Sequence, residues 1–424
     1  MSERGIASIQ DAGMAVVRRL REHGHEALWA GGCVRDMLLG RAPTDIDVAT
    51  DALPDEIITL FRHTRKVGVQ FGVVLVRQGR YWIETATFRQ DLDYADGRRP
   101  DQVIFTNAEH DAQRRDFTIN GLFYDPIEQR VIDYVGGQQD LAAGVIRAIG
   151  KPEERFAEDH LRMLRAARFT ARFGFQLDPP TGVAIRRHAA RLVRISPERI
   201  REELQKMFEQ PARAEAMRLI ADLNLLPYLW PAAQADWPAG RADQAVEVLA
   251  ALPPGADFVL CMAGMLNRQS PAGGERIGRA LRMSNHEIAD LCWLVGSHPR
   301  VGQAANMSAA TFKKLMAHPR REDLLALHRA ACIAEGFPLD AYERAWRRLE
   351  QLPREDLAPL PLVTGDDLIG LGLKPGPVFK SVLDELYDQQ LNGELPDRAA
   401  ALERLRLRVA QMFSPENGSP AAEP

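Results

Sequence analysis

The sequence has no apolar run of eighteen or more residues, and it contains only four cysteines and seven lysines among 424 residues. Without such a run we expect no membrane-spanning helix and no membrane partner, and the first five residues also lack the apolar core of a signal peptide. The cysteines, at positions 33, 261, 292 and 332, do not have the spacing of metal ligands. They are expected to be reduced, mostly buried thiols, which indicates a cytoplasmic protein.

The pattern of apolar residues changes near residue 150. Before it, an amphipathic helix near the start is followed by short apolar strands and turns, which predicts an α/β domain with a small mixed or antiparallel sheet and flanking helices. After Pro152 helical periodicity takes over, which predicts an all-α remainder. The strands are expected at residues 28–32, 44–49, 71–77, 81–87, 102–105, 121–125 and 131–134.

Proline clusters divide the helical remainder into segments. Breaks after about residue 220 and near residues 352–361 predict helical segments at 151–215, 216–355 and 356–413. The last residues, 414–424, have the composition of a disordered end. The composition, 46% hydrophobic and 26% charged, is that of a globular protein with several domains.

The most informative pattern is the run Gly31-Gly32-Cys33-Val34-Arg35-Asp36, which is followed nine residues later by Asp45-Ile46-Asp47. It predicts a strand that turns into a helix over residues 35–39, and a glycine turn there exposes backbone N–H groups that suit a phosphate. On a strand at 44–49, both aspartates would face one side and could hold Mg²⁺ for displacement at phosphorus. An acidic pair alone also occurs at solvated strand ends, but its place after the glycine turn favours the metal site.

Arginine is concentrated in one part of the chain. The net charge of −4 argues against a nucleic-acid partner, yet only seven of the 54 basic residues are lysine, and twelve arginines fall between Arg147 and Arg201. Solvated helix faces can explain arginines elsewhere. A cluster beside a nucleotide site favours a surface for RNA or triphosphate.

Further blocks follow the glycine turn and the aspartate pair in a fixed order. They are Arg114-Arg115-Asp116-Phe117-Thr118-Ile119-Asn120, Asp133-Tyr134-Val135-Gly136-Gly137, the helical run from Glu158 to Phe169, and Ser196-Pro197-Glu198-Arg199. With these blocks the sequence resembles class II tRNA nucleotidyltransferases (CCA-adding enzymes) and bacterial poly(A) polymerases, in the DNA polymerase β-like nucleotidyltransferase superfamily. The resemblance is strong in the first half of the chain and weaker in the tail.

The resemblance implies an α/β nucleotidyltransferase head at residues 1–150, a neck at 151–215 that recognises the base, a body at 216–355 and a tRNA-binding tail at 356–413. The implied activity is template-independent addition of CCA to the 3′ end of tRNA, from CTP and ATP, with Mg²⁺ as cofactor and pyrophosphate as leaving group. The sequence does not indicate an oligomeric state.

The same resemblance implies roles for individual residues of the head. Asp45 and Asp47 would be catalytic and bind the metal, Gly32 and Arg35 would contact the triphosphate, and Arg115 would contact the nucleotide. Glu84 could be a third carboxylate or the partner of an arginine, and we leave it out of the metal set.

The neck carries the residues expected to read the base. Asp159 and Arg162 are three residues apart in a segment expected to be helical, so they would lie on one face. The carboxylate can accept from the exocyclic amino group of cytosine or adenine while the guanidinium donates to the adjacent ring nitrogen; uracil and guanine reverse this pattern. Arg165 and Arg168 continue the helix and would serve phosphate or ribose.

Two alternatives remain open from the sequence. One is an A-adding enzyme or a poly(A) polymerase, and the other is a non-catalytic RNA-binding homologue, for which an aspartate pair would have no use. Residues 89–100 resemble a loop that CC-only enzymes lack, and residues 66–72 lack the basic block that poly(A) polymerases of this class carry. Both features favour full CCA addition.

Overall fold

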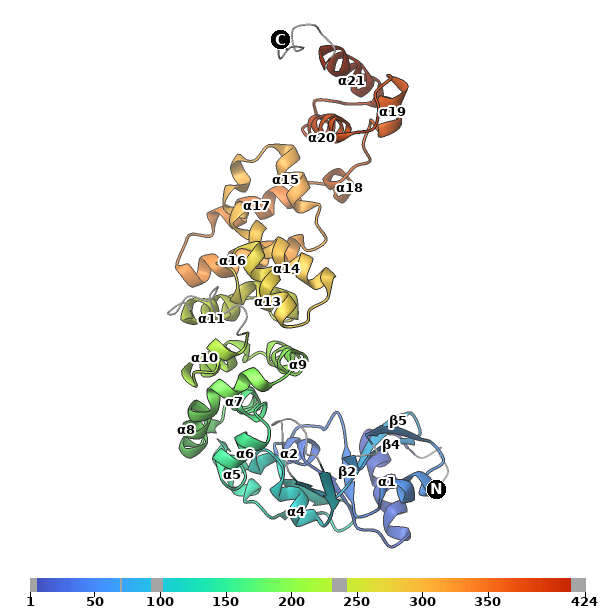
Figure 1. Ribbon diagram of the computed structural model, residues 1–424, viewed down its shortest axis with the longest axis vertical. Coiled ribbons are helices and arrows are strands. Elements are labelled where there is room, and N and C mark those ends of the chain that lie inside the picture. The colour runs from blue at the N-terminus through green and yellow to red at the C-terminus, as the bar shows by residue number, and fades with distance from the viewer. Residues whose placement is uncertain (1–5, 69–70, 93–101, 231–241, 413–424) are drawn as a thin grey trace, which may run out of the picture. The chain divides into compact units, whose positions relative to one another are not determined.

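The computed structural model describes residues 6–68, 71–92, 102–230 and 242–412 (Figure 1). It divides into two compact units, Met1–Val246 with Arg279–Met283, and Glu247–Gly278 with Ser284–Pro424. The finer division into head, neck, body and tail stays a prediction. Residues 93–100 of the loop singled out in the sequence, and those at 414–424, lie outside the described part.

A seven-stranded mixed sheet forms the centre of the first unit, which confirms the predicted mixed sheet, although β3 was not expected and the strand at 102–105 lies outside the sheet. Its strand order is β3-β4-β5-β2-β1-β8-β9, and only β2 and β5 pair in parallel. The strands are β1 (Ala27–Ala30), β2 (Asp47–Thr50), β3 (Thr64–Gly68), β4 (Val73–Gln78), β5 (Tyr81–Thr87), β8 (Leu122–Asp125) and β9 (Arg130–Asp133). The flanking helices are α1 (Ile9–Glu22), α2 (Gly32–Leu38), α3 (Pro54–Leu60), α4 (Ala108–Gln113), α5 (Gly137–Ala143) and the 3₁₀ turn η3 (Thr118–Asn120).

Helix α1 shows how the sequence specifies one of these elements. The Ser8 side chain accepts a hydrogen bond from the Asp11 amide, and the Asp11 carboxylate accepts from the Ser8 amide, which closes a capping box. Val16, Val17 and Leu20 are fully buried on one face of the helix. An apolar stripe with this spacing stabilises a helix by burial against the sheet.

Two small strand pairs lie outside the main sheet. Strands β6 (Arg89–Leu92) and β7 (Gln102–Phe105) are antiparallel, and β10 (Val145–Ile146) pairs in parallel with β11 (Gln176–Leu177). Strand β11 is a short exception to the expected all-helical remainder. It forms because the amides of Gln176 and Asp178 donate to the carbonyls of Gly144 and Ile146, at 2.8 and 3.0 Å.

Helices account for the rest of the first unit. They are α6 (Pro152–Glu158), α7 (Arg162–Phe173), α8 (Pro179–His188), η4 (Ala189–Arg194), α9 (Pro197–Phe208), α10 (Arg213–Asp222) and η5 (Leu226–Tyr228).

The second unit is helical throughout its described residues. Its elements are α12 (Phe258–Met265), α14 (Asn285–Ser297), η7 (His298–Asn306), α15 (Ala309–Met316), α16 (Arg321–Glu335), α17 (Asp340–Glu350), α18 (Arg354–Leu357), α19 (Gly365–Gly370), α20 (Pro377–Leu391) and α21 (Arg398–Met412). Helices α11 (Ala242–Ala251) and α13 (Pro271–Ala280) have residues in both units. Residues such as Leu368, Val382 and Leu405 form a separate core for the last three helices. Among the described residues, no helix has the length and apolar character needed to cross a membrane.

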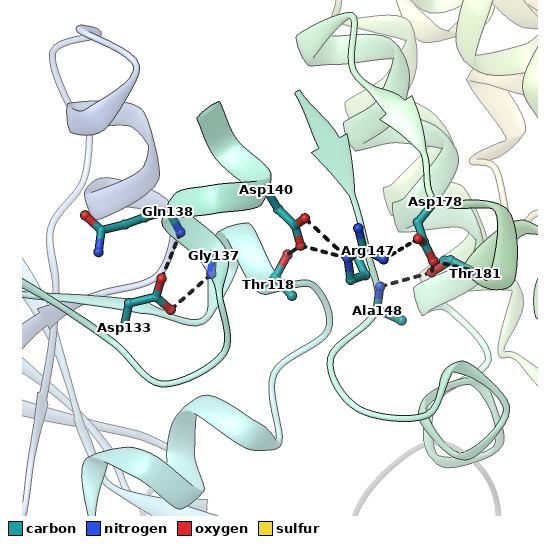
Figure 2. Close-up of polar contacts among 9 residues, drawn as sticks. All are labelled: Thr118, Asp133, Gly137, Gln138, Asp140, Arg147, Ala148, Asp178 and Thr181. Carbon is teal, nitrogen blue, oxygen red and sulfur yellow. Dashed lines mark hydrogen bonds and ion pairs between the residues drawn. The ribbon is translucent and has the colours of Figure 1, made fainter. Parts of the chain in front are cut away.

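Arg147 ties the segment after the sheet to the start of α8. Figure 2 shows its guanidinium between two carboxylates, with Nε donating to Asp140 at 3.1 Å and Nη1 to Asp178. Asp140 also accepts from the Thr118 hydroxyl at 2.7 Å, and Asp178 caps α8 by accepting from the Thr181 amide. One arginine therefore joins η3, α5, β10 and α8.

This network has a close backbone approach at its centre. A Cβ atom at Gly137 would lie 2.2 Å from the carbonyl oxygen of Thr118, so only glycine fits there. The amide of Gly137 donates to the Asp133 carboxylate at 3.0 Å, which fixes the first turn of α5 (Figure 2). This contact explains why the Asp133-to-Gly137 block has its particular residues.

Replacing Arg147 with methionine should lower the free energy of unfolding by about 1–3 kcal/mol, because two buried carboxylates lose their cationic partner. Since the Arg147 side chain is 45% exposed, the loss should fall below that for a fully buried pair. Chemical denaturation checks the value. The matched control is Lys151→Met, which removes an exposed ion pair with Glu154 and should leave stability unchanged. Equal effects of the two variants would contradict this role for Arg147.

Candidate active site

The glycine turn leads directly from β1 into α2. Gly31 has φ 72°, and α2 begins at Gly32, three residues before the predicted start. A Cβ atom at Gly31 would lie 2.7 Å from Nη1 of Arg115, so the turn is closed against that guanidinium. The amide of Arg35 donates to the Gly31 carbonyl at 3.1 Å, which explains the early start of the helix.

The two aspartates are arranged differently from the prediction. Strand β2 begins at Asp47, and Asp45 lies in the segment before it, so the expected alternation of both residues along one strand is wrong. Asp47 is instead the direct neighbour of Glu84 on the parallel strand β5. Burial, and then the charges of Glu84 and Asp45, raise the pKa of Asp47 to about 7. Three carboxylates therefore lie close together at the start of strand β2.

All nine predicted site residues line one cavity of about 800 Å³. They are Gly32, Arg35, Asp45, Asp47, Arg115, Asp159, Arg162, Arg165 and Arg168. The structure adds residues that the sequence reasoning did not select, namely Gly31, Glu84, Arg114, Asp116, Asn120, Leu161, Phe169, Arg172, Arg199 and Lys206. Nine of the lining side chains are basic and five are acidic, so the cavity suits a polyanionic ligand such as a triphosphate.

Asp116 is a buried residue in the wall of the cavity, and its carboxylate accepts several hydrogen bonds. One carboxylate oxygen accepts from the Phe117 amide and from Asn120, at 2.8 and 3.0 Å, and the other accepts from Nε of Arg165 at 2.7 Å. Burial opposes ionisation, but the Arg165 charge and the hydrogen bond from Asn120 outweigh it and hold the pKa of Asp116 at about 2.

Arg35 and Arg115 are both fixed by ion pairs. Arg35 is buried, donates to Asp36 at 2.8 Å and to the Asn120 side chain, and lies 4.7 Å from the ring centre of Phe173. Arg115 donates through Nε and Nη2 to Asp111, at 3.1 and 2.8 Å. The guanidinium groups are therefore held in place before any ligand binds.

Asp159 and Arg162 do not share a helix, which corrects the prediction. Asp159 follows the last residue of α6 in an extended conformation, with φ −140° and ψ 106°, and Arg162 is the first residue of α7. A tight turn brings them together, because the Leu161 amide donates to Oδ1 of Asp159 at 3.0 Å. Arg162 donates to Glu158 at 2.6 Å and to the carbonyl of Arg114 at 2.9 Å. Both residues nevertheless line the cavity.

Arg165 and Arg168 follow on α7 and are both paired. Arg165 binds Asp116, and Nε of Arg168 donates to Glu203, a buried residue on α9. Helix α9 also contributes Arg199 and Lys206 to the cavity. The helical spacing of these residues after Ser196-Pro197 was the signal that could have identified α9 as a wall of the site.

The predicted helix start before α9 is correct, with Pro197 as its first residue. Ser196 occupies the N-cap position, but it makes no capping hydrogen bond, and its hydroxyl is buried without a partner among the described residues. The proline alone therefore defines this helix start.

Two known domains match the chain. The poly(A) polymerase head domain matches residues 27–147, and the probable RNA- and SrmB-binding site of polymerase A matches residues 174–236. The first region contains the sheet with Asp45 and Asp47, and the second contains α9.

Curated relatives match almost the whole chain. The CCA-adding enzyme of Geobacillus thermodenitrificans is 36% identical over 387 residues, which cover 90% of this chain and 93% of the relative. The CCA-adding enzyme of Levilactobacillus brevis is 33% identical, with coverage of 91% and 95%.

Solved structures show the same architecture. The Bacillus stearothermophilus CCA-adding enzyme in complex with CTP superposes with a TM-score of 0.78 at 29% identity, covering 96% of this chain and 100% of that one. The Thermotoga maritima CCA-adding enzyme complexed with tRNA shares the fold, with a TM-score of 0.68 at 21% identity and coverage of 96% and 97%. With relatives above 30% identity that match over nine-tenths of its length, this chain belongs to the CCA-adding enzyme family of nucleotidyltransferases.

Proposed function

We propose that the protein adds C, C and A in turn to the 3′ end of tRNA, using CTP and ATP and releasing pyrophosphate. The observation that carries this proposal is the meeting of two sets of residues in one cavity. Asp45 and Asp47 belong to the head, whereas Asp159 and Arg162 belong to the first helices after it, and all four line the same space. Phosphoryl transfer and base selection can therefore act on one bound nucleotide.

The carboxylates at the start of β2 fit a divalent cation. Asp47 has its pKa raised to about 7 by burial and by the charges of Glu84 and Asp45, and a cation would relieve this repulsion. The described residues contain no group of three or more acidic, histidine or cysteine side chains able to enclose a metal alone. Mg²⁺ commonly takes one or two carboxylates and completes its shell with water and substrate phosphates. We therefore propose Asp45 and Asp47 as its ligands.

The reaction proposed is attack of the RNA 3′-hydroxyl on the α-phosphate of the bound nucleotide. When bound, Mg²⁺ would lower the pKa of the attacking hydroxyl and neutralise charge on the leaving pyrophosphate. Arg35 and Arg115 are fixed guanidiniums beside the carboxylates and would bind the triphosphate without reorganisation. The turn at Gly32 would offer a backbone amide to the same anion.

Base selection is assigned to Asp159 and Arg162. The carboxylate of Asp159 would accept from the amino group of cytosine or adenine, and Arg162 would donate to the neighbouring ring nitrogen. Arg162 is already held by Glu158 and by the Arg114 carbonyl, so its guanidinium needs little ordering. Uracil and guanine would place a carbonyl against the carboxylate and an N–H against the guanidinium.

Arg165 and Arg168 would support the nucleotide from α7, close to its phosphate or ribose. The helical segments at 216–355 and 356–413 would bind tRNA, mainly through its backbone shape and its single-stranded end. We propose that this takes place in the cytoplasm, in agreement with four cysteines that are all free thiols.

A tRNA that ends before CCA should be extended by two residues with CTP alone, should not be extended with ATP alone, and should gain CCA with both. Gel analysis of the three products tests the function directly. Extension with ATP alone into a long tail would indicate a poly(A) polymerase instead. Extension only of tRNA that already ends in CC would indicate an A-adding enzyme.

Replacing Asp45 or Asp47 with alanine should reduce nucleotide incorporation at least 100-fold, because several kcal/mol of transition-state stabilisation depend on such a charge. Binding of tRNA should change little, because the carboxylates would hold metal rather than RNA. Incorporation and filter binding measure the two effects separately. Turnover by Asp47→Ala near that of the natural enzyme would contradict the metal assignment.

Removing the charge at residue 47 should stabilise the metal-free protein. Because the pKa of Asp47 is about 7 in the folded state and about 4 in an unfolded chain, the protein loses stability as pH rises between these values, and the full cost of the charge is present above about pH 7. Asp47→Asn should therefore raise Tm at pH 8 more than at pH 6, by about 2–4 °C for each kcal/mol gained. Added Mg²⁺ should then raise the Tm of the natural protein more than that of the variant.

The control is Glu128→Gln, which removes an exposed carboxylate between β8 and β9. It should show neither the pH dependence nor the altered response to Mg²⁺. An equal Mg²⁺-dependent rise in Tm for Asp47→Asn and the natural protein would place the metal elsewhere.

A further inference from the structure

Asp159 is oriented by hydrogen bonds rather than by a helix. It lies in extended backbone between α6 and α7, and each of its carboxylate oxygens accepts one protein hydrogen bond. Oδ1 accepts from the Leu161 amide at 3.0 Å, and Oδ2 accepts from Nη2 of Arg199 at 2.7 Å. The backbone bond is local to the turn, whereas Arg199 comes from α9, forty residues further along the chain. The direction of the carboxylate therefore depends on a distant side chain.

Helix α9 contacts two residues that line the cavity, through side chains one turn apart. Arg199 pairs with Asp159, and Glu203, four residues later on the same face, accepts from Arg168. Helix α9 therefore forms ion pairs with two residues assigned to nucleotide binding, Asp159 and Arg168. Pro197 begins that helix and so determines where Arg199 is presented.

The guanidinium of Arg199 makes a hydrogen bond to Asp159 through one of its two terminal nitrogens. Only Nη2 contacts the carboxylate, and Nη1 is buried without a hydrogen-bond partner in the described part of the chain. Among the protein groups that the structure describes, Asp159 is therefore the side-chain partner of this guanidinium. Each carboxylate oxygen also has a second acceptor position, which leaves Asp159 able to accept from a base while Arg199 holds it.

We propose that Arg199 is a positioning residue for base selection: it aims the Asp159 carboxylate at the exocyclic amino group of the incoming cytosine or adenine. The pairing also occupies Nη2, a donor that would otherwise suit the carbonyl at the corresponding position of uracil or guanine. This inference rests on the proposed role of Asp159. It predicts that replacing Arg199 lowers kcat/KM only for nucleotides whose base carries the amino group that Asp159 recognises.

The test compares CTP with its analogue lacking the 4-amino group, the triphosphate of the pyrimidin-2-one ribonucleoside, on tRNA that ends before CCA. Arg199→Met should lower kcat/KM for CTP about 10- to 100-fold, which is the range of strong coupling between interacting groups. For the analogue, kcat/KM of Arg199→Met should stay within about twofold of the value for the natural enzyme, because the analogue has no amino group to donate a hydrogen bond to Asp159. On tRNA ending in CC, Arg199→Met should likewise lower kcat/KM for ATP and leave kcat/KM for the 6-deamino purine triphosphate nearly unchanged.

Two further variants complete the comparison. Arg199→Lys, which keeps one charged donor, should recover part of the loss for CTP, and it carries the same comparison if Arg199→Met does not fold. The matched control is Arg130→Met, which removes an exposed arginine on β9 outside the cavity and should change neither substrate.

An equal loss of kcat/KM for CTP and for its analogue in the Arg199 variants would show a structural role and overturn the inference. Asp159→Ala, assayed in parallel, separates this result from a failure of the proposed function. If Asp159→Ala removes the preference for CTP and the Arg199 variants retain it, only the role of Arg199 is wrong. If Asp159→Ala also keeps the preference, base recognition by Asp159 is itself wrong.

Discussion

The buried carboxylate of Asp116 is the contact on which the geometry of the cavity depends. It joins the head to the following helices through Arg165, and through Asn120 it reaches Arg35, which in turn pairs with Asp36. A carboxylate with so many donors stays ionised when buried, and its pKa of about 2 reflects that. Because the chain links groups that are far apart in sequence, loss of one member would move several arginines together.

Electrostatic conflict is confined to the part of the cavity where chemistry is expected. Asp47 and Glu84 are neighbours on parallel strands, and burial, followed by the charges of Glu84 and Asp45, raises the pKa of Asp47 more than the nearby Arg115 lowers it. Arg115, which is close enough to lower that pKa, is itself bound by Asp111. The protein thus satisfies the charges that position the nucleotide and leaves unsatisfied those that a cation would neutralise.

The sequence was sufficient for a mixed sheet and a helical remainder, because strand and helix periods are local signals, and the ordered blocks selected nine residues that line one cavity. The sequence did not predict the positions of residues that depend on long-range strand pairing or on a tight turn. The parallel register that puts Glu84 beside Asp47 has no local signal, and neither does the tight turn that separates Asp159 from α7. Helix α9 was predicted with the correct start, but the long-range contacts show that Arg199 pairs with Asp159 and Glu203 with Arg168.

Several arginines between residues 147 and 201 form ion pairs within the protein, in addition to any contact with a ligand. Arg147, Arg165, Arg168 and Arg199 each pair with a carboxylate of the chain, so their charges are largely compensated internally. The net charge of −4 follows from the 58 acidic and 54 basic residues of the whole chain, and these pairs show where some of the arginine charge is neutralised. Exposed arginines outside the cavity, such as Arg191 and Arg194 on η4, have more of their charge available to RNA phosphates. Counting arginines therefore overstates the charge available to RNA, because a guanidinium that already neutralises a carboxylate displaces fewer counterions from a phosphate backbone.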